Sequence, residues 1–526
     1  MIRLAFSRRT DYLQNIWGKY FCQIIFHQER LTMNFKTDLY RSSLALLTDL
    51  YQITMAYGYW KSGRLNDEAV FNLSFRANPF NGGYTIACGL SHVIDYLDDL
   101  KFDGTDIAYL ETLRGNDQNP LFEKKFLDYL RNLEFKLDVD AIPEGTAVFA
   151  HEPLIRVKGP LLACQLVESP ILNLINFQTL IATKSARICQ AAQGEPVVEF
   201  GLRRAQGIDG SLSASRAAYV GGCTATSNVL AGKLFGIPVK GTHAHSWVMC
   251  FDDELSAFEA YARALPNNCI FLVDTYDTLE GVRNAIEAGK SLRQAGHEMV
   301  GVRLDSGDLA YLSIEARKML DEAGFPKVSI VATNDLDEHL ISSLKQQNAT
   351  IAVWGVGTKL VTAYDQPALG GIYKLSAIRK DGGNWQYKVK LSEQSLKTTT
   401  PGILQVRRFR DANGYVADMT YDTLLGISTN PTIIDPFDPL RQKELDVSKL
   451  DHEDLLVPVF RDGRQVYQQP SLDEIRNRTI LQLKNLHQGV RRLVHPHSYP
   501  AGLEQRLYDL KVKLILDAKV NKNSAL

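Results

Sequence analysis

Short apolar runs rich in β-branched residues recur through the middle of the chain, each followed by a polar residue or glycine and then by a stretch with helical spacing. The runs begin roughly 20–40 residues apart, which is typical of strand–helix units in a parallel sheet buried on both faces. Because these units are numerous and their rhythm is steady, we expect an α/β barrel of about seven βα units rather than an open sheet. The runs are Val197–Phe200, Ile237–Lys240, Ile270–Val273, Met299–Leu304, Val328–Ala332, Ile351–Val356 and Gly371–Leu375.

The two ends of the chain have a different pattern, with strands and helices that do not alternate regularly. Apolar spacing predicts helices over 44–62, 88–100, 121–133, 471–488 and 500–518. Alternation and turn residues predict strands over 69–75, within 145–168, and over 385–391, 403–409 and 415–424. We therefore expect an N-terminal α+β segment (41–190), a barrel (191–380) and a C-terminal α+β segment (381–526) that packs on the N-terminal one.

Composition narrows the class of protein. Hydrophobic residues make up 45% of the 526 residues and charged residues 23%, as in ordinary globular proteins. The 59 Lys and Arg nearly balance the 60 Asp and Glu, so no overall charge favours nucleic acid or an anionic membrane. No apolar run is long enough to span a bilayer, and the seven cysteines lack close pairing, which favours a reducing cytoplasm.

Residues 1–40 are set apart from the predicted fold. The first 32 residues are rich in Arg and poor in acidic residues. Their apolar piece, 21–26, is too short and too late for a secretory signal. We interpret 1–40 as an extension outside the fold, with Met33 as the natural start of the folded protein and a transit peptide as the alternative.

Polar, charged or glycine residues follow six of the apolar runs in succession. In a βα barrel the carboxyl ends of the strands share one rim, and reactive groups gather there. We therefore expect these residues to form one functional site. They are Gly201–Arg204, Gly241–Ser246, Asp274–Thr275, Arg303–Asp308, Thr333–Asp335 and Gly355–Thr358.

The residue types on this rim favour a phosphorylated sugar as ligand. Gly355–Thr358 allows backbone N–H groups to approach an anion closely. Asp305 and Asp308 can accept ribose hydroxyls or hold Mg²⁺ through its water shell, with capping of the next helix by Ser306 or Asp308 as the alternative. Arg203, Arg204 and Arg303 are suited to carboxylate or phosphate, with a structural ion pair as the alternative for each.

His243 and His245 leave two kinds of chemistry open. On a strand they would share a face, and a His-x-His pair at a barrel strand end can bind zinc when further ligands stand on other strands. The remaining histidines do not fall on those strand ends. The competing hypothesis is a single reactive imidazole that acts as base or nucleophile, and a histidine without chemical role is the third.

Several motifs together resemble the nicotinate phosphoribosyltransferase family, in order and with the expected spacing, over about residues 44–425. Residues after about 430 match only loosely, and 1–40 lie outside. The motifs are Leu47–Met55 (LTDLYQITM), Phe75–Phe80 (FRANPF), Glu199–Gly207 (EFGLRRAQG), Gly241–Ser246 (GTHAHS), Val302–Leu309 (VRLDSGDL), Gly355–Thr358 (GVGT) and Thr399–Gly402 (TTPG).

The resemblance implies an irregular, TIM-like βα barrel plus a mixed α+β domain built from both chain ends, assembled as a homodimer with the active site near the interface. It implies transfer of phosphoribose from phosphoribosyl diphosphate to nicotinate, which yields nicotinate mononucleotide and diphosphate. ATP would be a co-substrate through a phosphohistidine, formally as a C–N ligase, with Mg²⁺ as cofactor. The pathway would be the salvage synthesis of NAD.

The resemblance also assigns roles to particular residues. His245 resembles the histidine that ATP phosphorylates, while His243 occupies a variable position and receives no role. Tyr51, Thr242 and Arg303 match nicotinate-binding residues, and Thr358 matches a phosphoribosyl-diphosphate contact. By their place on the same rim, Arg203, Asp305, Asn334 and Gly357 are added as substrate-binding residues. No residue is assigned directly to the metal.

Four alternatives remain open at this point. Nicotinamide and quinolinate phosphoribosyltransferases share the implied fold. A zinc-dependent barrel hydrolase would use His243 and His245. A ligand-binding or scaffold protein without turnover is the last alternative.

Overall fold

The computed structural model describes residues 44–391 and 398–523, so the extension expected at 1–40 lies outside the described residues. The chain divides into two compact units. The smaller unit includes Asp99–Leu133 and contains α5 (Gly104–Thr112) and α6 (Lys124–Arg131), which pack on each other. Asp103 and Asp106 form a capping box that starts α5. The larger unit contains all three of the large sheets described below.

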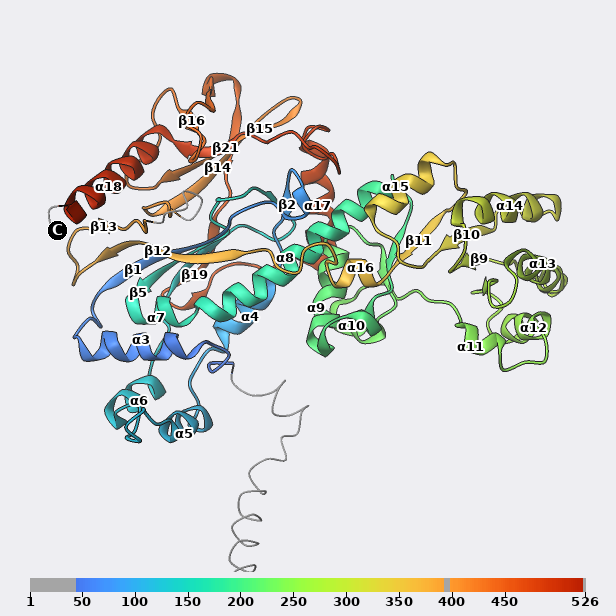
Figure 1. The fold of residues 1–526 in the computed structure, drawn as a ribbon, viewed down its shortest axis with the longest axis horizontal. Helices are drawn as coiled ribbons and strands as arrows, with labels where there is room; N and C mark the ends of the chain where they lie inside the picture. The colour runs from blue at the N-terminus through green and yellow to red at the C-terminus, as the bar shows by residue number, and fades with distance from the viewer. Residues whose placement is uncertain (1–43, 392–397, 524–526) are drawn as a thin grey trace, which may run out of the picture. The chain divides into compact units, whose positions relative to one another are not determined.

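A six-stranded parallel sheet is built from the apolar runs of the middle of the chain (Figure 1). Its order is β7-β6-β11-β10-β9-β8, and its pairs run parallel throughout. The carboxyl ends of all six strands therefore meet at one edge. The strands are β6 (Val197–Glu199), β7 (Ala225–Thr226), β8 (Ile270–Leu272), β9 (Gly301–Leu304), β10 (Ser329–Ala332) and β11 (Val353–Val356).

Helices follow these strands, as expected for βα units. Asp277, Asp308 and Asp337 cap α13, α14 and α15, because each carboxylate accepts backbone N–H groups of the first turn. The helices are α9 (Gly207–Val220), α10 (Val229–Phe235), α11 (His245–Val248), α12 (Glu254–Ala264), α13 (Thr278–Gln294), α14 (Leu309–Glu322), α15 (Glu338–Gln346) and α16 (Thr358–Val361).

The closed barrel of seven units that we expected does not form among the described residues. The hydrogen-bonded order ends at β8 on one side and at a single parallel bridge from Thr226 to Val239 on the other. The seventh run, Gly371–Leu375, belongs to β12 (Gly371–Arg379), which pairs antiparallel with β1 in another sheet. An apolar run shows that a strand is buried, but it does not identify the strand beside it.

The second sheet has seven strands drawn from distant parts of the chain, in the order β13-β12-β1-β5-β3-β19-β20. Its first strand in sequence begins at Glu68 and its last ends at Gln465, so both the N-terminal and the C-terminal part of the chain contribute to it. The domain boundaries at 190 and 380 stay predictions. The strands are β1 (Glu68–Phe75), β3 (Asp138–Ala141), β5 (Ile155–Pro160), β12, β13 (Gln386–Tyr387), β19 (Val457–Arg461) and β20 (Arg464–Gln465).

One long helix connects this sheet with the parallel sheet. α8 (Glu168–Ala191) packs on α4 (Leu90–Asp98) and β12 near one sheet, and on α9 and α15 near the other (Figure 1). Its second half is almost wholly buried, including Lys184 and Arg187, which both pair with the buried Glu338 of α15. The remaining elements of this part are α3 (Leu50–Lys61), α7 (Leu161–Leu166), η1 (Pro79–Asn81), β2 (Thr85–Ile86) and β4 (Ala147–Val148).

A third, six-stranded sheet lies in the C-terminal segment, in the order β17-β16-β21-β15-β14-β18. Residues 501–504, expected to begin a helix, instead form β21, which pairs parallel with β15 before α18 starts. No helix among the described residues is long and apolar enough to cross a membrane. The elements are β14 (Leu404–Asp411), β15 (Gly414–Asp422), β16 (Thr432–Ile434), β17 (Gln442–Glu444), η4 (Val447–Lys449), β18 (Asp451–Asp454), α17 (Leu472–Asn485), β21 (Ala501–Glu504) and α18 (Gln505–Asn523).

Candidate active site

A cavity of about 490 Å³ lies at the carboxyl ends of the parallel strands. Residues that follow β6, β9, β10 and β11 line it, together with the segment that follows the Val239 bridge. Its lining is mixed, with basic, acidic, hydroxyl and aromatic side chains and three glycines. The lining residues are Phe200, Leu202, Arg203, Arg204, Ser227, Gly241–His245, Leu272, Arg303, Asp305, Thr333–Asp335, Gly355, Gly357 and Thr358.

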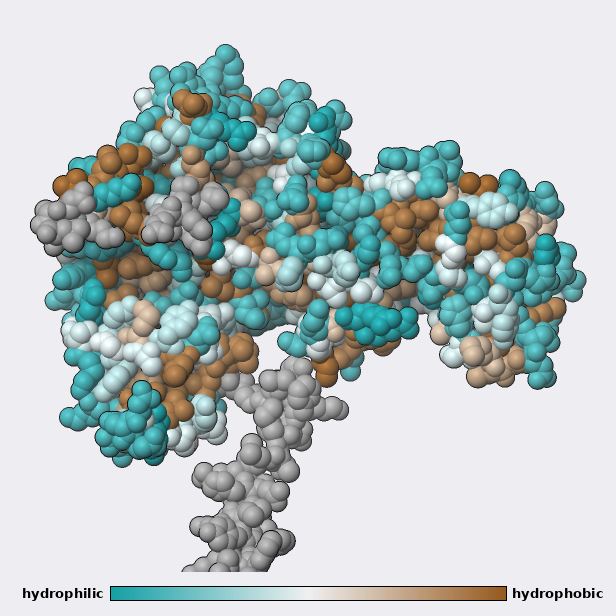
Figure 2. Space-filling model, viewed as in Figure 1, coloured by the Kyte–Doolittle hydropathy of each residue, from teal (hydrophilic) through white to brown (hydrophobic). Residues whose placement is uncertain are grey.

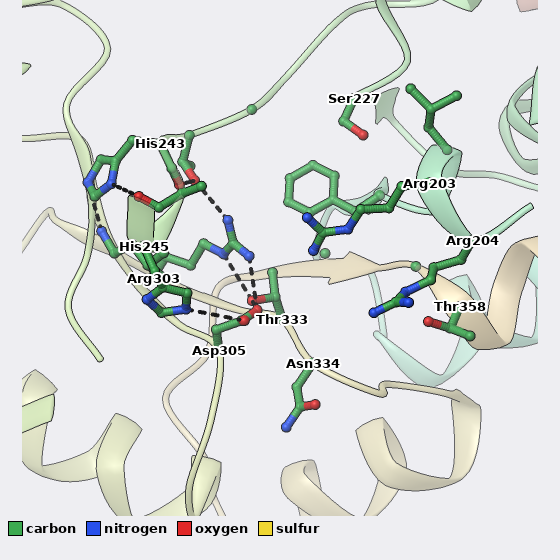
Figure 3. A pocket seen from close by; sticks show the side chains of 18 of the residues that line it. Arg203, Arg204, Ser227, His243, His245, Arg303, Asp305, Thr333, Asn334 and Thr358 are labelled. Atoms are coloured by element: carbon green, nitrogen blue, oxygen red, sulfur yellow. Dashed lines mark hydrogen bonds and ion pairs between the residues drawn. The ribbon is translucent and has the colours of Figure 1, made fainter. Parts of the chain in front are cut away.

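Arg303 is held rigidly at the centre of the site (Figure 3). Its Nε donates to Thr333 Oγ1 at 3.0 Å, and one Nη donates to Thr242 Oγ1 at 3.0 Å. The other Nη donates to Asp305 Oδ1 at 2.9 Å. A guanidinium carries five N–H groups, so this arrangement leaves one on each terminal nitrogen for a ligand. A carboxylate offers an acceptor oxygen for each of these two N–H groups.

Asp305 is a carboxylate that stays ionised although it is partly buried. Burial opposes its ionisation, but the hydrogen bond from Thr333 and the charge of Arg303 outweigh that effect and lower its pKa. Its backbone N–H donates to Asp274 Oδ2 at 3.2 Å, which fixes the turn after β9. The site therefore keeps a fixed negative charge beside its central cation.

His245 is the first residue of α11 and faces the same carboxylate. Its Nε2 lies 3.7 Å from Asp305 Oδ2, and its Nδ1 lies 3.1 Å from Thr275 Oγ1. The side chain is 40% exposed, so the imidazole is accessible from the cavity. A ring held at one nitrogen with the other beside a carboxylate is oriented for proton or group transfer.

His243 does not join His245 in a metal site. It is buried, with its ring against Phe258 and Tyr261, and its Nε2 accepts the N–H of Leu272 at 3.1 Å. Burial lowers its pKa to about 4, which keeps the ring neutral at physiological pH. Among the described residues no group of three or more His, Cys, Asp or Glu could hold a metal ion, which counts against the zinc hydrolase alternative.

The glycines in and directly after β11 allow the chain to pass close to Phe200. A Cβ on Gly355 would lie 2.6 Å from Thr333 Cγ2 and 2.9 Å from the Phe200 ring, and one on Gly357 would lie 3.1 Å from the Phe200 carbonyl. The glycines therefore leave room for Phe200 beside the cavity. Thr358 begins the short helix α16 directly after Gly357, and its side chain lines the cavity.

Asn334 has an uncommon backbone conformation, with φ of 102°. A non-glycine residue pays an energetic cost there, and such residues cluster at functional sites. Its side-chain oxygen accepts the N–H of Asp335, which stabilises the turn after β10. Both residues line the cavity.

Arg203 and Arg204 add positive charge on the side of the cavity formed by η2 (Leu202–Arg204) (Figure 3). Both are exposed, and neither has an acidic partner among the residues that the structure describes. Unpaired guanidiniums beside glycine-rich backbone can attract a phosphorylated ligand. Together with Arg303 they leave the site with more basic than acidic side chains.

The structure brings together all of the predicted site residues except one. His245, Arg203, Thr242, Arg303, Asp305, Asn334, Gly357 and Thr358 line the cavity. Tyr51 is not among the lining residues. It lies on α3, which packs on α7, and the residue is 48% exposed. Burial and the nearby Glu168 and Asp49 carboxylates raise its pKa, so its hydroxyl is neutral at physiological pH.

Sequence reasoning missed several lining residues. Phe200 is the last residue of an apolar run and was counted with the strand, although an aromatic side chain at a strand end is itself a signal of a ring-binding site. Thr333 and Asp335 fell within a polar strand end but were given no role. Ser227 follows β7, a two-residue strand too short to produce an apolar run.

Three models of known families match the chain. The model described as the nicotinate phosphoribosyltransferase (NAPRTase) N-terminal domain matches residues 46–176. That of the nicotinate phosphoribosyltransferase (NAPRTase) family matches 196–413, and that of the nicotinate phosphoribosyltransferase C-terminal domain matches 405–511. Between them they span nearly the whole of the described chain.

Individual relatives agree with these models. The chain is 43% identical to a nicotinate phosphoribosyltransferase of Bacillus subtilis (strain 168), over 93% of this chain and 98% of that protein. It is 36% identical to the Homo sapiens nicotinate phosphoribosyltransferase, over 88% of this chain and 95% of that protein. The crystal structure of human nicotinic acid phosphoribosyltransferase superimposes with a TM-score of 0.76 at 33% identity, covering 89% of this chain and 99% of the human one.

Proposed function

The chain belongs to the nicotinate phosphoribosyltransferase family, and we propose that it transfers phosphoribose from phosphoribosyl diphosphate to nicotinate. The products are nicotinate mononucleotide and diphosphate. The observation that carries this proposal is the state of Arg303, whose guanidinium is fixed by three protein oxygens and still has two N–H groups free for a carboxylate.

Nicotinate fits the centre of the cavity by charge and by shape. Its carboxylate is proposed to accept the two remaining N–H groups of Arg303. Phe200 lines the cavity, with its ring centroid 5.8 Å from the Arg303 guanidinium carbon, so a pyridine ring held by Arg303 can stack on it. Thr242 has a supporting role, because its hydroxyl orients Arg303.

Phosphoribosyl diphosphate is proposed to bind between the β10 and β11 ends and η2. Thr358 and the backbone at Gly357 offer donors for a phosphate, and Arg203 offers an unpaired positive charge. Asn334 and Asp305 offer oxygens and an amide for the ribose hydroxyls. These assignments follow from the position of the side chains around one cavity.

The reaction places opposite charges on the two reacting groups. The lone pair of the pyridine nitrogen forms the new bond to the anomeric carbon. The bond from that carbon to the diphosphate oxygen breaks, and its electron pair leaves with diphosphate. Positive charge develops on the ribose, where Asp305 can stabilise it, and negative charge on diphosphate, where Arg203 can do so.

Magnesium is proposed as the cofactor. The described residues contain no preformed cage of three or more acidic or histidine ligands, while Asp305 and Asp335 line the cavity. This donor set fits an ion that keeps its waters and arrives with phosphate groups. When bound, Mg²⁺ would neutralise the diphosphate leaving group.

ATP is proposed to be a co-substrate that phosphorylates His245. The γ-phosphoryl group would move from ATP to an imidazole nitrogen, which adds ~1.5–2 negative charges next to Asp305 and Arg303. Water would later remove it, so that each turnover hydrolyses one ATP and the enzyme is formally a C–N ligase. The reaction would belong to the salvage synthesis of NAD.

The functional unit is proposed to be a homodimer with its active sites near the interface. One exposed apolar face lies on and beside α3 and includes Tyr51. Another lies on η2, the start of α9 and α10, and Figure 2 shows apolar side chains beside hydrophilic ones in the region of α9 and α10. In a two-fold dimer each face can cover the other, which would bring Tyr51 to the cavity of the partner. The exposed apolar residues are Leu47, Leu50, Tyr51 and Met55 on the first face and Leu202, Ile208, Val229, Leu230 and Leu234 on the second.

The six cysteines among the described residues are free thiols, which supports the cytoplasm as the proposed location.

Turnover of three pyridines tests the proposed substrate. Purified protein with phosphoribosyl diphosphate, Mg²⁺ and ATP receives nicotinate, nicotinamide or quinolinate in turn, and the mononucleotides are separated by chromatography. Nicotinate should be used far better than nicotinamide, which lacks the charge that Arg303 requires. Preference for nicotinamide or quinolinate would reassign the substrate. Activity lost to chelators and restored by zinc alone, without Mg²⁺, would favour the hydrolase alternative.

A further inference from the structure

The parallel sheet has an open seam between β8 and the segment around Val239, and a side chain spans it. Thr226 pairs with Val239 on one side of the seam, through N–H groups of Thr226 and Lys240. On the other side, β8 pairs only with β9 among the described strands. His243, four residues beyond Val239, reaches across and accepts the N–H of Leu272 in β8 at 3.1 Å.

The hydrogen bond between Leu272 N–H and His243 Nε2 lies on the uncovered edge of β8. Val273 N–H donates to the Arg303 carbonyl of β9. Successive amides of a strand point to opposite sides, so the N–H of Leu272 faces away from β9. Leu272 N–H is buried, and without an acceptor it would carry the cost of an unpaired donor. The imidazole therefore takes the place of the carbonyl that a neighbouring strand would supply.

We propose that His243 is a positioning residue for nicotinate binding: by accepting the Leu272 N–H it fixes the segment that orients Thr242 and, through Thr242, Arg303. This inference rests on the proposed function, because Arg303 is the proposed carboxylate-binding residue. His243 touches no substrate in this account and acts only through its neighbours.

The contacts form a continuous chain from the seam to the guanidinium. The backbone carbonyl of His243 accepts the Thr242 hydroxyl at 3.1 Å. The same hydroxyl oxygen accepts an Nη–H of Arg303 at 3.0 Å. Because Thr242 has one hydroxyl hydrogen, its donation to His243 leaves the oxygen lone pairs for Arg303. A shift of the His243 backbone would therefore reach the guanidinium directly.

The surroundings of His243 favour the neutral ring that this role requires. Phe258 and Tyr261 of α12 pack on it, with ring centroids 5.9 and 4.9 Å away. Nδ1 lies 3.3 Å from the Ala244 carbonyl, which suits a proton on Nδ1 and a free lone pair on Nε2. Arg303 and His245 are the charged and titratable groups that oppose its protonation.

A residue that only fills space would behave differently from one that supplies an acceptor, and two substitutions separate these roles. His243→Phe keeps a ring of similar size but removes the acceptor. His243→Gln loses the ring but can place its amide oxygen near the position of Nε2. His297→Gln is the matched control, since His297 is a histidine bonded to Asn267 away from the cavity.

Two readouts test the proposal in the full-length protein. In kinetic assays with saturating phosphoribosyl diphosphate and ATP, His243→Phe should raise KM for nicotinate about tenfold with a much smaller change in kcat. His243→Gln should restore KM to within about threefold of wild type, and His297→Gln should not change it. Equal KM values for wild type and His243→Phe would overturn the proposal, as would a Phe variant that outperforms the Gln variant.

Hydrogen–deuterium exchange of the peptide that contains Leu272 supplies a readout that does not depend on catalysis. Exchange should be faster in His243→Phe than in wild type and slower again in His243→Gln. An unchanged exchange rate in the Phe variant would overturn the acceptor role even if the enzyme is active. If the wild-type protein forms no nicotinate mononucleotide but the exchange pattern is as expected, the proposed function fails while the seam contact stands.

Discussion

His245 Nε2 lies 3.7 Å from Asp305 Oδ2, so the imidazole proposed to accept a phosphoryl group faces a carboxylate. The same carboxylate pairs with Arg303 through its other oxygen, at 2.9 Å. A negative charge added to His245 would repel Asp305 and compete for Arg303. This shared carboxylate is a physical route by which phosphorylation at one position can change nicotinate binding at another.

Asp305→Asn should reduce both the use of nicotinate and the stimulation by ATP. An amide keeps the shape of the side chain but removes its charge, so we expect a fall in kcat/KM for nicotinate of about 10–100-fold and a weaker stimulation by ATP. Steady-state assays with and without ATP measure both effects. Asp308→Asn is the matched control, because Asp308 caps α14 and asparagine caps equally well. Equal losses in both variants would contradict the role of Asp305.

Arg303→Lys should weaken nicotinate binding although the charge is kept. Lysine cannot reproduce the planar fork that bonds Thr333, Thr242 and Asp305 while it presents two N–H groups to a ligand. We expect KM for nicotinate to rise about 100-fold, as measured by initial rates. Arg263→Lys, at an exposed position on α12, should leave KM unchanged. A normal KM in the Arg303→Lys variant would remove Arg303 from the nicotinate site.

Gly355→Ala should destabilise the protein because its Cβ would meet Thr333 and Phe200 at less than 3 Å. Overpacking of this kind costs about 1–3 kcal/mol, and a displaced Phe200 should also reduce activity. Thermal unfolding and the nicotinate assay test these effects separately. Gly241→Ala is the control within the same cavity, since a Cβ there meets nothing within 4 Å. If Gly241→Ala were the more harmful change, the close approach at Gly355 would not matter.

Lys511→Met should stabilise the protein near neutral pH. Burial lowers the pKa of Lys511 from 10.5 to about 8, with Asp435 offsetting part of the effect. The folded state therefore carries a penalty that is fully present below pH 8 and shrinks as the pH rises from 8 to 10.5, because the unfolded chain holds its proton longer. At pH 7 methionine should add up to ~3 kcal/mol to the free energy of unfolding.

Chemical denaturation from pH 7 to 10.5 measures this effect. The gain from Lys511→Met should decline across that range, and Lys513→Met, at an exposed position on the same helix, should show no such gain. A gain that does not change with pH would mean that apolar packing, and not relief of a buried charge, stabilises the variant.

Mixing two defective variants should restore ATP-stimulated activity if Tyr51 serves the partner's site. Tyr51→Ala and His245→Asn each damage every site of their own homodimers. In a heterodimer one site combines both defects, while the other has an intact Tyr51 and an intact His245. Random exchange of subunits should therefore recover about a quarter of the wild-type ATP-stimulated activity above the basal rate. If mass spectrometry verifies subunit exchange and no activity is recovered, Tyr51 does not serve the site of the partner subunit.

The sequence was sufficient to predict most of the residues that line the cavity but not the whole fold. The residues that follow β6, β9, β10 and β11 were predictable as neighbours in space, because parallel strands place their carboxyl ends at one edge. The prediction of a seventh barrel unit was wrong, since the apolar run at 371–375 pairs antiparallel with β1. The burial of a strand is local information in the sequence, whereas the choice of its neighbour depends on the whole fold.

The contacts of individual side chains could also not be predicted from the sequence. His243 and His245 stand two residues apart, yet one is buried against Leu272 and the other faces the cavity. Their difference comes from the start of α11 between them, which ends the strand-like alternation. Tyr51 was assigned to the site by family resemblance, but it lies on α3 and is not among the residues that line the cavity. The proposed homodimer is the arrangement in which it would reach a site.

The central claim is tested most directly by the rate at which purified wild-type protein forms nicotinate mononucleotide from nicotinate, phosphoribosyl diphosphate and Mg²⁺, with and without ATP. We predict product in both cases and a higher rate with ATP, accompanied by ATP hydrolysis. His245→Asn should keep a basal rate and lose the stimulation. No nicotinate mononucleotide under either condition would contradict the proposed activity, and full ATP stimulation in His245→Asn would contradict the phosphohistidine.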